Sequence, residues 1–164
     1  MKKTIIQLML VFLLIYGVMY IFIIMGPKES ETIGKERDIE IPRAPEENKL
    51  VRNPAPNTPD VIAKGKEIFH GKGGCFACHG MTGLGDGPSG LALNPRPRNF
   101  ANPRFQEIRT DGELFWVIRN GSPGTGMFSY SPAYITEEEA WMVIRYLRTI
   151  PKENEALTQS APAK

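Results

Sequence analysis

The chain contains few thiol and imidazole groups and has no concentrated positive charge. Its 164 residues include two cysteines and two histidines, and the formal net charge is +2. No long block of lysine or arginine is present, which excludes the basic face that a nucleic-acid partner requires. The length allows one modest domain with additional segments, so a large multidomain enzyme is excluded as well.

Charged residues are also missing from residues 4–27, TIIQLMLVFLLIYGVMYIFIIMGP. A helix of about 20 apolar residues spans a hydrocarbon core of about 30 Å, so this segment is predicted to be a transmembrane anchor. A cleaved signal peptide would have a shorter apolar region, about 7–15 residues, followed by a small-residue cleavage site. No such A-x-A pattern follows here, and no cysteine lies nearby to carry a lipid.

The charges around this segment predict its orientation. Lys2 and Lys3 precede it, whereas Lys28 and Glu29 begin a stretch of mixed charge after it. The positive-inside tendency therefore predicts a cytoplasmic N-terminus. Everything from Lys28 onward is expected on the outer, periplasmic side of the inner membrane.

Residues 28–57 are charged and contain four prolines, with little apolar periodicity. They are predicted to form a linker, either a flexible tether or a segment that lies along a partner protein. The last residues, 152–164, are predicted to be a frayed tail.

Between these segments, residues 58–151 are predicted to be a compact all-α domain, because three helices have clear boundaries and no β pattern is found. The first helix begins at Thr58 and ends at Gly71. Thr110 with Glu113, and Thr136 with Glu139, form capping boxes that start the other two. The apolar face of the first helix contains Val61, Ile62, Gly65, Ile68 and Phe69, and that of the last contains Ala140, Val143, Ile144 and Leu147. Glycine costs about 1 kcal/mol within a helix, so Gly65 indicates a close approach by another helix.

Both cysteines occur in Cys75-Phe76-Ala77-Cys78-His79, inside a glycine-rich stretch. C-x-x-C-H is the attachment signature of c-type haem. In one helical turn the thiols of Cys75 and Cys78 reach two neighbouring vinyl groups as thioethers, and His79 comes under the iron. A thioredoxin-like motif would need a βαβ setting. A structural zinc site would need four ligands with a different spacing.

The second axial ligand is predicted to be Met127. Four other methionines lie at or within the predicted membrane segment, Met81 is too close to His79 in sequence, and Met142 lies within the last helix. Met127 lies in the turn-rich loop NGSPGTGMFSYSP, which can direct a thioether inward. His70 is the alternative ligand, but it lies only nine residues before His79.

The chain resembles the class I monohaem cytochromes c. The matching residues are Gly65 and Phe69, the CFACHG attachment, GMF around Met127, and YLR at residues 146–148. The resemblance implies that the first and last helices cross at Gly65, with Phe69 and Tyr146 beside the crossing. Two further stretches, HGMTGLGDGPSGLALNPRPRNF and MFSYSPAYITEEEAWMVIRYLRTI, look like the monohaem subunit of alternative complex III, a quinol:cytochrome c oxidoreductase. The departure is the predicted anchor, because many such subunits are lipid-attached.

The resemblance also implies a proline carbonyl that accepts a hydrogen bond from the proximal imidazole. Pro88 and Pro95 are the two candidates. Arg96 and Arg98 are candidates for pairing with haem propionates, and solvated loop charges are the other interpretation. Phe105, Phe115, Trp116 and Ile118 are expected to surround the haem.

These residues predict one covalent haem c and single-electron exchange, because protein side chains fill both axial positions. No catalytic residue and no small-molecule substrate are expected, so the chain is predicted to be an electron carrier rather than a catalyst by itself. Its partners are expected to be the membrane and redox proteins, as a subunit of a quinol-oxidising complex or as a tethered shuttle. A haem peroxidase and a gas sensor are the alternatives, and the predicted Met127 ligand disfavours both.

Overall fold

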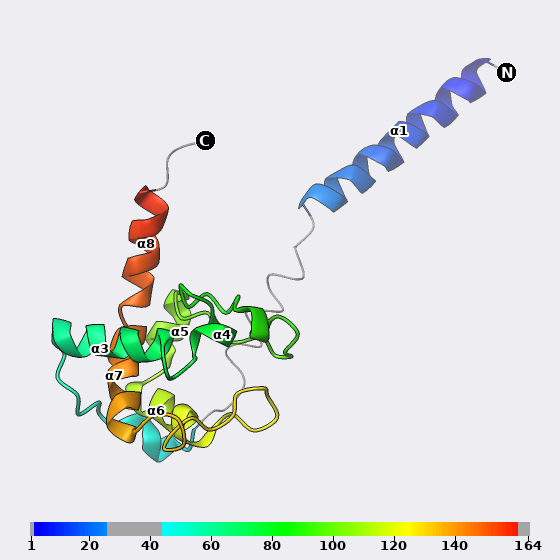
Figure 1. The fold of residues 1–164 in the computed structure, drawn as a ribbon. Coiled ribbons are helices and arrows are strands. Elements are labelled where there is room, and N and C mark those ends of the chain that lie inside the picture. The colour runs from blue at the N-terminus through cyan, green and yellow to red at the C-terminus, as the bar shows by residue number, and fades with distance from the viewer. Residues whose placement is uncertain (1, 26–43, 161–164) are drawn as a thin grey trace. The chain divides into compact units, whose positions relative to one another are not determined.

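The computed structural model describes residues 2–25 and 44–160, and the chain divides into two compact units, Met1–Glu40 and Ile41–Lys164. The described part of the first unit is one helix, α1 (Lys2–Met25), at the place where the sequence predicts a helix (Figure 1). Within the described residues, no helix is long and apolar enough to cross a membrane. The membrane anchor over 4–27 therefore stays a prediction.

The second unit consists of short helices joined by loops, and its described residues contain no β-strand. The all-α prediction is thus confirmed for this part of the chain, and the three predicted helices are present as α3, α6 and α7. In chain order the unit contains the 3-10 helix η1 (Glu46–Leu50), α3 (Pro59–His70), α4 (Phe76–His79), the 3-10 helix η2 (Pro88–Gly90), α5 (Pro103–Ile108), α6 (Asp111–Asn120), α7 (Glu137–Leu147) and α8 (Ile150–Ser160).

Capping boxes begin α6 and α7 at the predicted residues. The Thr110 hydroxyl accepts from the Glu113 N–H at 3.3 Å, and the Glu113 carboxylate accepts from the Thr110 N–H at 2.8 Å. Thr136 and Glu139 make the same two bonds at 3.2 and 3.0 Å. Each box satisfies two backbone donors that a helix start would leave unpaired, so short-range sequence alone determines where these helices begin.

The helices α3 and α7 pack closely at Gly65, as the sequence predicts. A Cβ at Gly65 would overlap the backbone carbonyl of Met142 on α7. Next to this contact, the rings of Phe69 and Tyr146 meet edge to face with centroids 5.4 Å apart, and both side chains are buried. The absence of a side chain at Gly65 therefore permits the backbone contact that brings the two helices together.

Gly65→Ala is expected to lower the free energy of unfolding by about 1–3 kcal/mol, because the added methyl group meets rigid backbone and forces the helices apart. Chemical denaturation of the haem-loaded protein measures the change. Ala63→Ser on the exposed side of α3 is the matched control and is expected to change stability by less than about 0.5 kcal/mol. An equal stability of Gly65→Ala and the parent would contradict the close contact.

Residues 44–57 differ from the linker predicted over 28–57, because they lie along the domain. The 3-10 helix η1 within them packs against α6. Residues 28–43 lie outside the described residues. The linker over residues 28–43 therefore stays a prediction.

One side chain and one backbone carbonyl of α7 hold this segment. Arg145 donates from Nε to the Ala55 carbonyl at 2.9 Å and from Nη2 to the Asn53 carbonyl at 3.1 Å. The Asn53 side-chain amide in turn donates to the Trp141 carbonyl at 3.0 Å. These bonds join residues about 90 positions apart, so the composition of the segment gives no sign of them.

The predicted tail also begins as an ordered helix, α8. Pro151 occupies its first turn, where the missing N–H of proline costs no hydrogen bond. Ile150 is buried in the core, and the Asn154 side-chain amide donates to the Thr82 carbonyl at 3.0 Å. Contacts with a distant loop therefore stabilise a segment whose sequence looks like a frayed end. The final four residues of the chain lie outside the described part.

Candidate functional site

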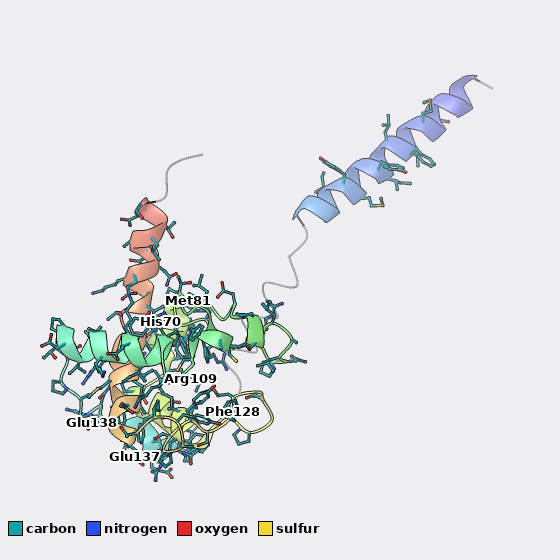
Figure 2. The ribbon with its side chains drawn as sticks, in the orientation of Figure 1. His70, Met81, Arg109, Phe128, Glu137 and Glu138 are labelled. Carbon is teal, nitrogen blue, oxygen red and sulfur yellow. The ribbon has the colours of Figure 1, made fainter. Side chains whose placement is uncertain are left out.

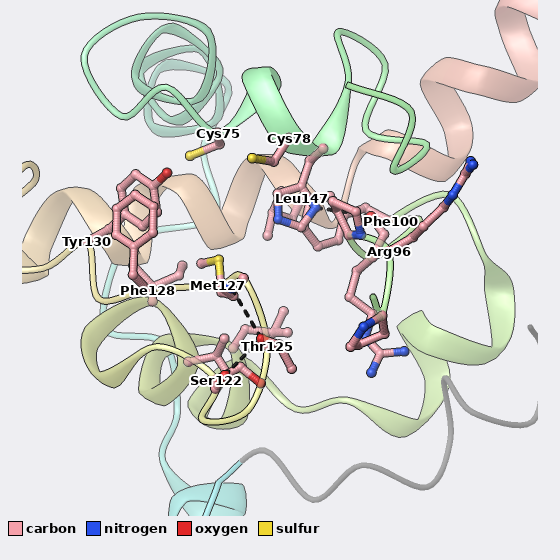
Figure 3. Close-up of a pocket in the computed structure, with 18 of the residues that line it drawn as sticks. Cys75, Cys78, Arg96, Phe100, Ser122, Thr125, Met127, Phe128, Tyr130 and Leu147 are labelled. Atoms are coloured by element: carbon pink, nitrogen blue, oxygen red, sulfur yellow. Dashed lines mark hydrogen bonds between the residues drawn. The ribbon is translucent and has the colours of Figure 1, made fainter. Parts of the chain in front are cut away.

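A large cavity lies between α4, α6, α7 and the two long loops of the second unit. Its empty volume, counted together with the space at its open mouth, is about 1110 Å³. Cys75, Cys78, His79 and Met127 all line it (Figure 3). The fold thus brings together all four residues that the sequence predicts for haem attachment and ligation, although Met127 is far from the other three in sequence.

The two cysteines lie on one helical turn. Cys75 is the N-cap of α4 and already has helical backbone angles, and its carbonyl accepts from the His79 N–H at 2.9 Å. Figure 3 shows both sulfur atoms on the same wall of the cavity. This arrangement matches the predicted attachment of two neighbouring groups of one planar cofactor.

The Cys75 thiol does not suit metal binding or disulfide exchange. Both cysteines are free, and burial raises the pKa of the Cys75 thiol to about 12. Zinc binding and thiol exchange require thiolates, which this environment disfavours. Among the described residues, no group of three or more His, Cys, Asp and Glu side chains is arranged to hold a metal ion.

His79 is held by the backbone of the following loop. Its Nδ1 lies 3.1 Å from the Arg98 carbonyl, so Nδ1–H donates and Nε2 keeps its lone pair for a metal. Burial lowers the pKa of the ring to about 4, which leaves the imidazole neutral near pH 7. The predicted acceptors were Pro88 and Pro95; the structure corrects this, because the carbonyl belongs to Arg98.

Backbone hydrogen bonds explain why Arg98 is the acceptor. The Gly85 N–H donates to the His79 carbonyl at 2.8 Å, and the Phe100 N–H donates to the Gly83 carbonyl at 2.7 Å. The second bond brings the end of the loop back to its beginning, so that residues 98–100 lie beside the imidazole. The Phe100 ring stacks on His79 with centroids 4.5 Å apart.

Met127 is positioned by a compact loop after α6. Gly121 ends α6 with φ +76°, a conformation that favours glycine. The Ser122 N–H donates to the Met127 carbonyl at 2.7 Å, and the Met127 N–H donates to the Thr125 hydroxyl at 3.2 Å. With its backbone held on both sides, Met127 directs its thioether into the cavity, facing the cysteines (Figure 3).

His70, the alternative ligand, does not line the cavity. Its Nδ1 lies 2.9 Å from the Lys66 carbonyl and its Nε2 lies 2.8 Å from the Met81 carbonyl. Figure 2 shows His70 and Met81 close together. Both ring nitrogens therefore face backbone oxygen atoms, and His70 connects α3 to the loop after α4.

The aromatic surroundings of the cavity agree with the sequence prediction in part. Phe105 and Ile118 line the cavity as expected, but Phe115 and Trp116 do not. Phe115 instead stacks on Trp141 with centroids 4.0 Å apart, because that face of α6 packs against α7. The sequence reading missed the aromatic residues Phe69, Phe100, Phe128 and Tyr130, which line the cavity from other elements.

Two exposed aromatic side chains, Phe128 and Tyr134, and the half-buried Tyr130 follow Met127 in the chain. The rings of Phe128 and Tyr130 stack with centroids 4.6 Å apart, and Tyr134 lies 5.5 Å from Tyr130. Burial raises the pKa of Tyr130 to about 12, so its phenol stays neutral. The rings of Phe128 and Tyr130 line the cavity together with Met127.

Four charged side chains line the otherwise apolar cavity. Two of them, Arg96 and Arg98, are the candidates that the sequence analysis names. The other two, Arg109 and Glu113, were missed. The sequence analysis identified Glu113 only as part of the capping box with Thr110. A capping box explains where α6 starts, but it does not show that the glutamate faces a cavity.

The cavity fits a covalently attached haem. Two free thiols, a neutral imidazole with a free Nε2 and a thioether meet in a largely apolar space. Guanidinium groups are present in the lining to pair with carboxylates. The residues thus provide attachment, ligation, apolar contact and charge compensation for this group.

Comparisons with known proteins agree with this geometry. A family model described as "Cytochrome c" matches residues 62–151. A solved structure titled "Kuenenia stuttgartiensis reducing HAO-like protein complex" is similar, with a TM-score of 0.53 and 27% sequence identity. The similar region covers 59% of this chain but only 46% of that one. No curated protein gives a significant sequence match.

Proposed function

The chain belongs to the cytochrome c family, and from this premise we propose that it is a membrane-anchored monohaem electron carrier. The family implies a covalently bound haem c and a role in electron transfer. The single observation that supports the assignment to particular residues is the convergence of Cys75, Cys78, His79 and Met127 on one cavity.

In this proposal Cys75 and Cys78 would hold the haem through two thioether bonds, and Nε2 of His79 and the sulfur of Met127 would bind its iron. The bound haem supplies one-electron chemistry. The protein contributes the rest: the Arg98 carbonyl orients His79, the loop bonds hold Met127, and the apolar walls limit water. With both of these side chains bound, the iron would have no position left for a substrate, and the thioether would favour the ferrous state.

The proposed location is the outer face of the inner membrane, with residues 4–27 as the anchor. The support comes from the sequence: an uncharged stretch of sufficient length, two lysines before it, and a haem type that is expected to be attached outside the cytoplasm. The helix α1 covers nearly all of this stretch.

We further propose that the chain works as a subunit of a quinol-oxidising membrane complex. The similar solved structure is, by its title, part of a protein complex in its own organism. Residues 44–57 are bonded to the domain and do not lengthen a tether. Fewer residues are then left for any tether, which favours a fixed position over a long-range shuttle.

Mild detergent extraction of native membranes, followed by a native gel stained for haem, tests this proposal. The band containing this chain is expected to migrate with a multisubunit, multihaem assembly that mass spectrometry identifies. Migration of the chain alone would instead support a tethered shuttle. Recovery in the soluble fraction before detergent is added would contradict the membrane anchor.

A further inference from the structure

The first turns of α8 contact the loop that follows the haem motif. The side-chain amide of Asn154 donates to the Thr82 carbonyl and to the Ile150 carbonyl, each at 3.0 Å. An amide nitrogen carries two N–H groups, so one of them is used within α8 and the other reaches a residue 72 positions earlier in the chain. This second bond fastens the loop to the helix at Thr82.

Gly83 extends the contact between α8 and the loop. A Cβ at Gly83 would lie 2.8 Å from Ile150 Cδ1 and 3.4 Å from Phe100 Cδ2. Ile150 itself is 1% exposed, so it cannot move aside without leaving the core. The backbone at residue 83 is therefore packed closely between a side chain of α8 and the Phe100 ring.

The same backbone determines where two neighbours of His79 lie. The Gly83 carbonyl accepts from the Phe100 N–H at 2.7 Å, and the Phe100 ring stacks on the imidazole. Arg98, which precedes Phe100 on the same stretch, supplies the carbonyl that lies 3.1 Å from His79 Nδ1. That distance is near the upper end of the usual range of about 2.7–3.2 Å, so a small outward shift of the loop would weaken the bond.

The family likeness does not account for α8. The matched region ends at residue 151, whereas α8 runs over Ile150–Ser160 and places Asn154 beyond that end. The helix continues from the end of α7 and leaves the rest of the unit (Figure 1), and its residues 155–160 are exposed. Its packed part is therefore limited to the turns that touch the loop after the haem motif.

We propose that α8 braces the His79 side of the haem site, with Asn154 and Ile150 as positioning residues. These two side chains hold residues 82–83, and that backbone in turn holds residues 98–100 against the imidazole. The inference rests on the proposed function, because His79 acts as an iron ligand only when haem is bound.

The brace acts on the electron density of the imidazole. A hydrogen bond from Nδ1 to a carbonyl makes the histidine a more basic ligand, and a more basic ligand favours ferric over ferrous iron. A loop that is held less firmly would weaken the bond between His79 and the Arg98 carbonyl. The reduction potential is then expected to rise.

Asn154→Leu and Ile150→Val are the two test variants, measured on the haem-loaded full chain. Leucine keeps the size of asparagine without its N–H groups, and valine lacks the Cδ1 atom that faces Gly83. In both variants the Phe100 amide is expected to exchange hydrogen roughly three- to tenfold faster, because its bond to Gly83 opens more often. The reduction potential is expected to rise by about threefold in the equilibrium constant, roughly 28 mV for one electron.

Resonance Raman spectroscopy measures the histidine bond directly. In the Met127→Ala background the ferrous iron keeps His79 as its protein ligand. The iron–histidine stretch is expected to move to lower frequency when Asn154→Leu or Ile150→Val is added to this background. A loss of stability alone would not move this band.

Thr158→Val and Ile144→Val are the matched controls. Thr158 is exposed and donates to the Asn154 carbonyl at 2.9 Å within α8, so Thr158→Val removes a side-chain donor without touching the loop. Ile144 is fully buried in α7 and absent from the cavity lining, so Ile144→Val removes the same methyl group elsewhere in the core. Both controls are expected to keep the parent potential and stretching frequency, although Ile144→Val lowers the stability.

A parent-like potential and stretching frequency in Asn154→Leu and Ile150→Val would overturn the inference, because α8 would then contribute stability alone. Shifts of the same size in Ile144→Val would overturn it as well. Absence of covalent haem from the parent protein would refute the proposed function itself, whereas unchanged signals in haem-loaded variants would reject only the brace.

Discussion

The double substitution Cys75→Ser and Cys78→Ser is expected to abolish covalent haem completely. These are the two cysteines of the chain, so no other thiol can form a thioether. Haem staining after denaturing electrophoresis, with mass spectrometry of the intact protein, measures the loss. The domain is also expected to lose most of its stability, because the apolar walls of the cavity would have no group to pack against.

The single variants are the controls for this result. Cys75→Ser and Cys78→Ser each leave one thiol on the same wall of the cavity, and each is expected to retain haem through one thioether with a shifted absorption maximum. Haem that survives denaturation in the double variant would show that the attachment is elsewhere and would refute the assignment of both cysteines.

Met127→Ala is expected to retain the haem while it opens the axial position opposite His79. The ferrous protein should then bind carbon monoxide, and the reduction potential should fall by roughly 0.1 V or more, within the range of about 0.8 V that axial ligands span. The physical reason is that the thioether favours ferrous iron. Optical spectra with and without carbon monoxide, together with a potentiometric titration, measure both effects.

Met81→Ala is the matched control for Met127→Ala. Met81 follows His79 by two residues, and its side chain is 62% exposed and absent from the cavity lining. The spectrum, the potential and the lack of carbon monoxide binding are expected to stay as in the parent. If Met127→Ala also matched the parent, the axial ligand would have to be another residue, and His70→Ala would be the next variant to measure.

Local sequence was sufficient to predict a structural feature wherever the contacts that determine the feature lie within one or two helical turns. The motif Cys75 to His79 is predictable because its residues share one turn. The capping boxes at Thr110 and Thr136 are predictable because their bonds span three residues. Gly65 predicted the helix contact because glycine destabilises a helix relative to alanine. Its presence on the apolar face therefore indicates a structural need for a residue without a side chain.

Met127 was also predicted from sequence, but by elimination among the methionines rather than by contact. The structure adds the reason for its position: the Ser122 N–H and the Thr125 hydroxyl hold its backbone from both sides. The sequence shows a loop rich in turn residues there. It does not show which side chain the loop directs into the cavity.

What the sequence by itself determined is the haem type, the all-α class and the start of each main helix, since these follow from short-range spacing. The tertiary structure alone decided that Arg98 supports His79, that residues 44–57 and α8 are ordered, and that Glu113 faces the cavity with Arg109. Apart from the Arg109–Glu113 pair itself, these are contacts between residues far apart in the chain. A long-range contact forms only when the packing of the helices brings two distant parts of the chain together. No local pattern of residue types specifies that packing.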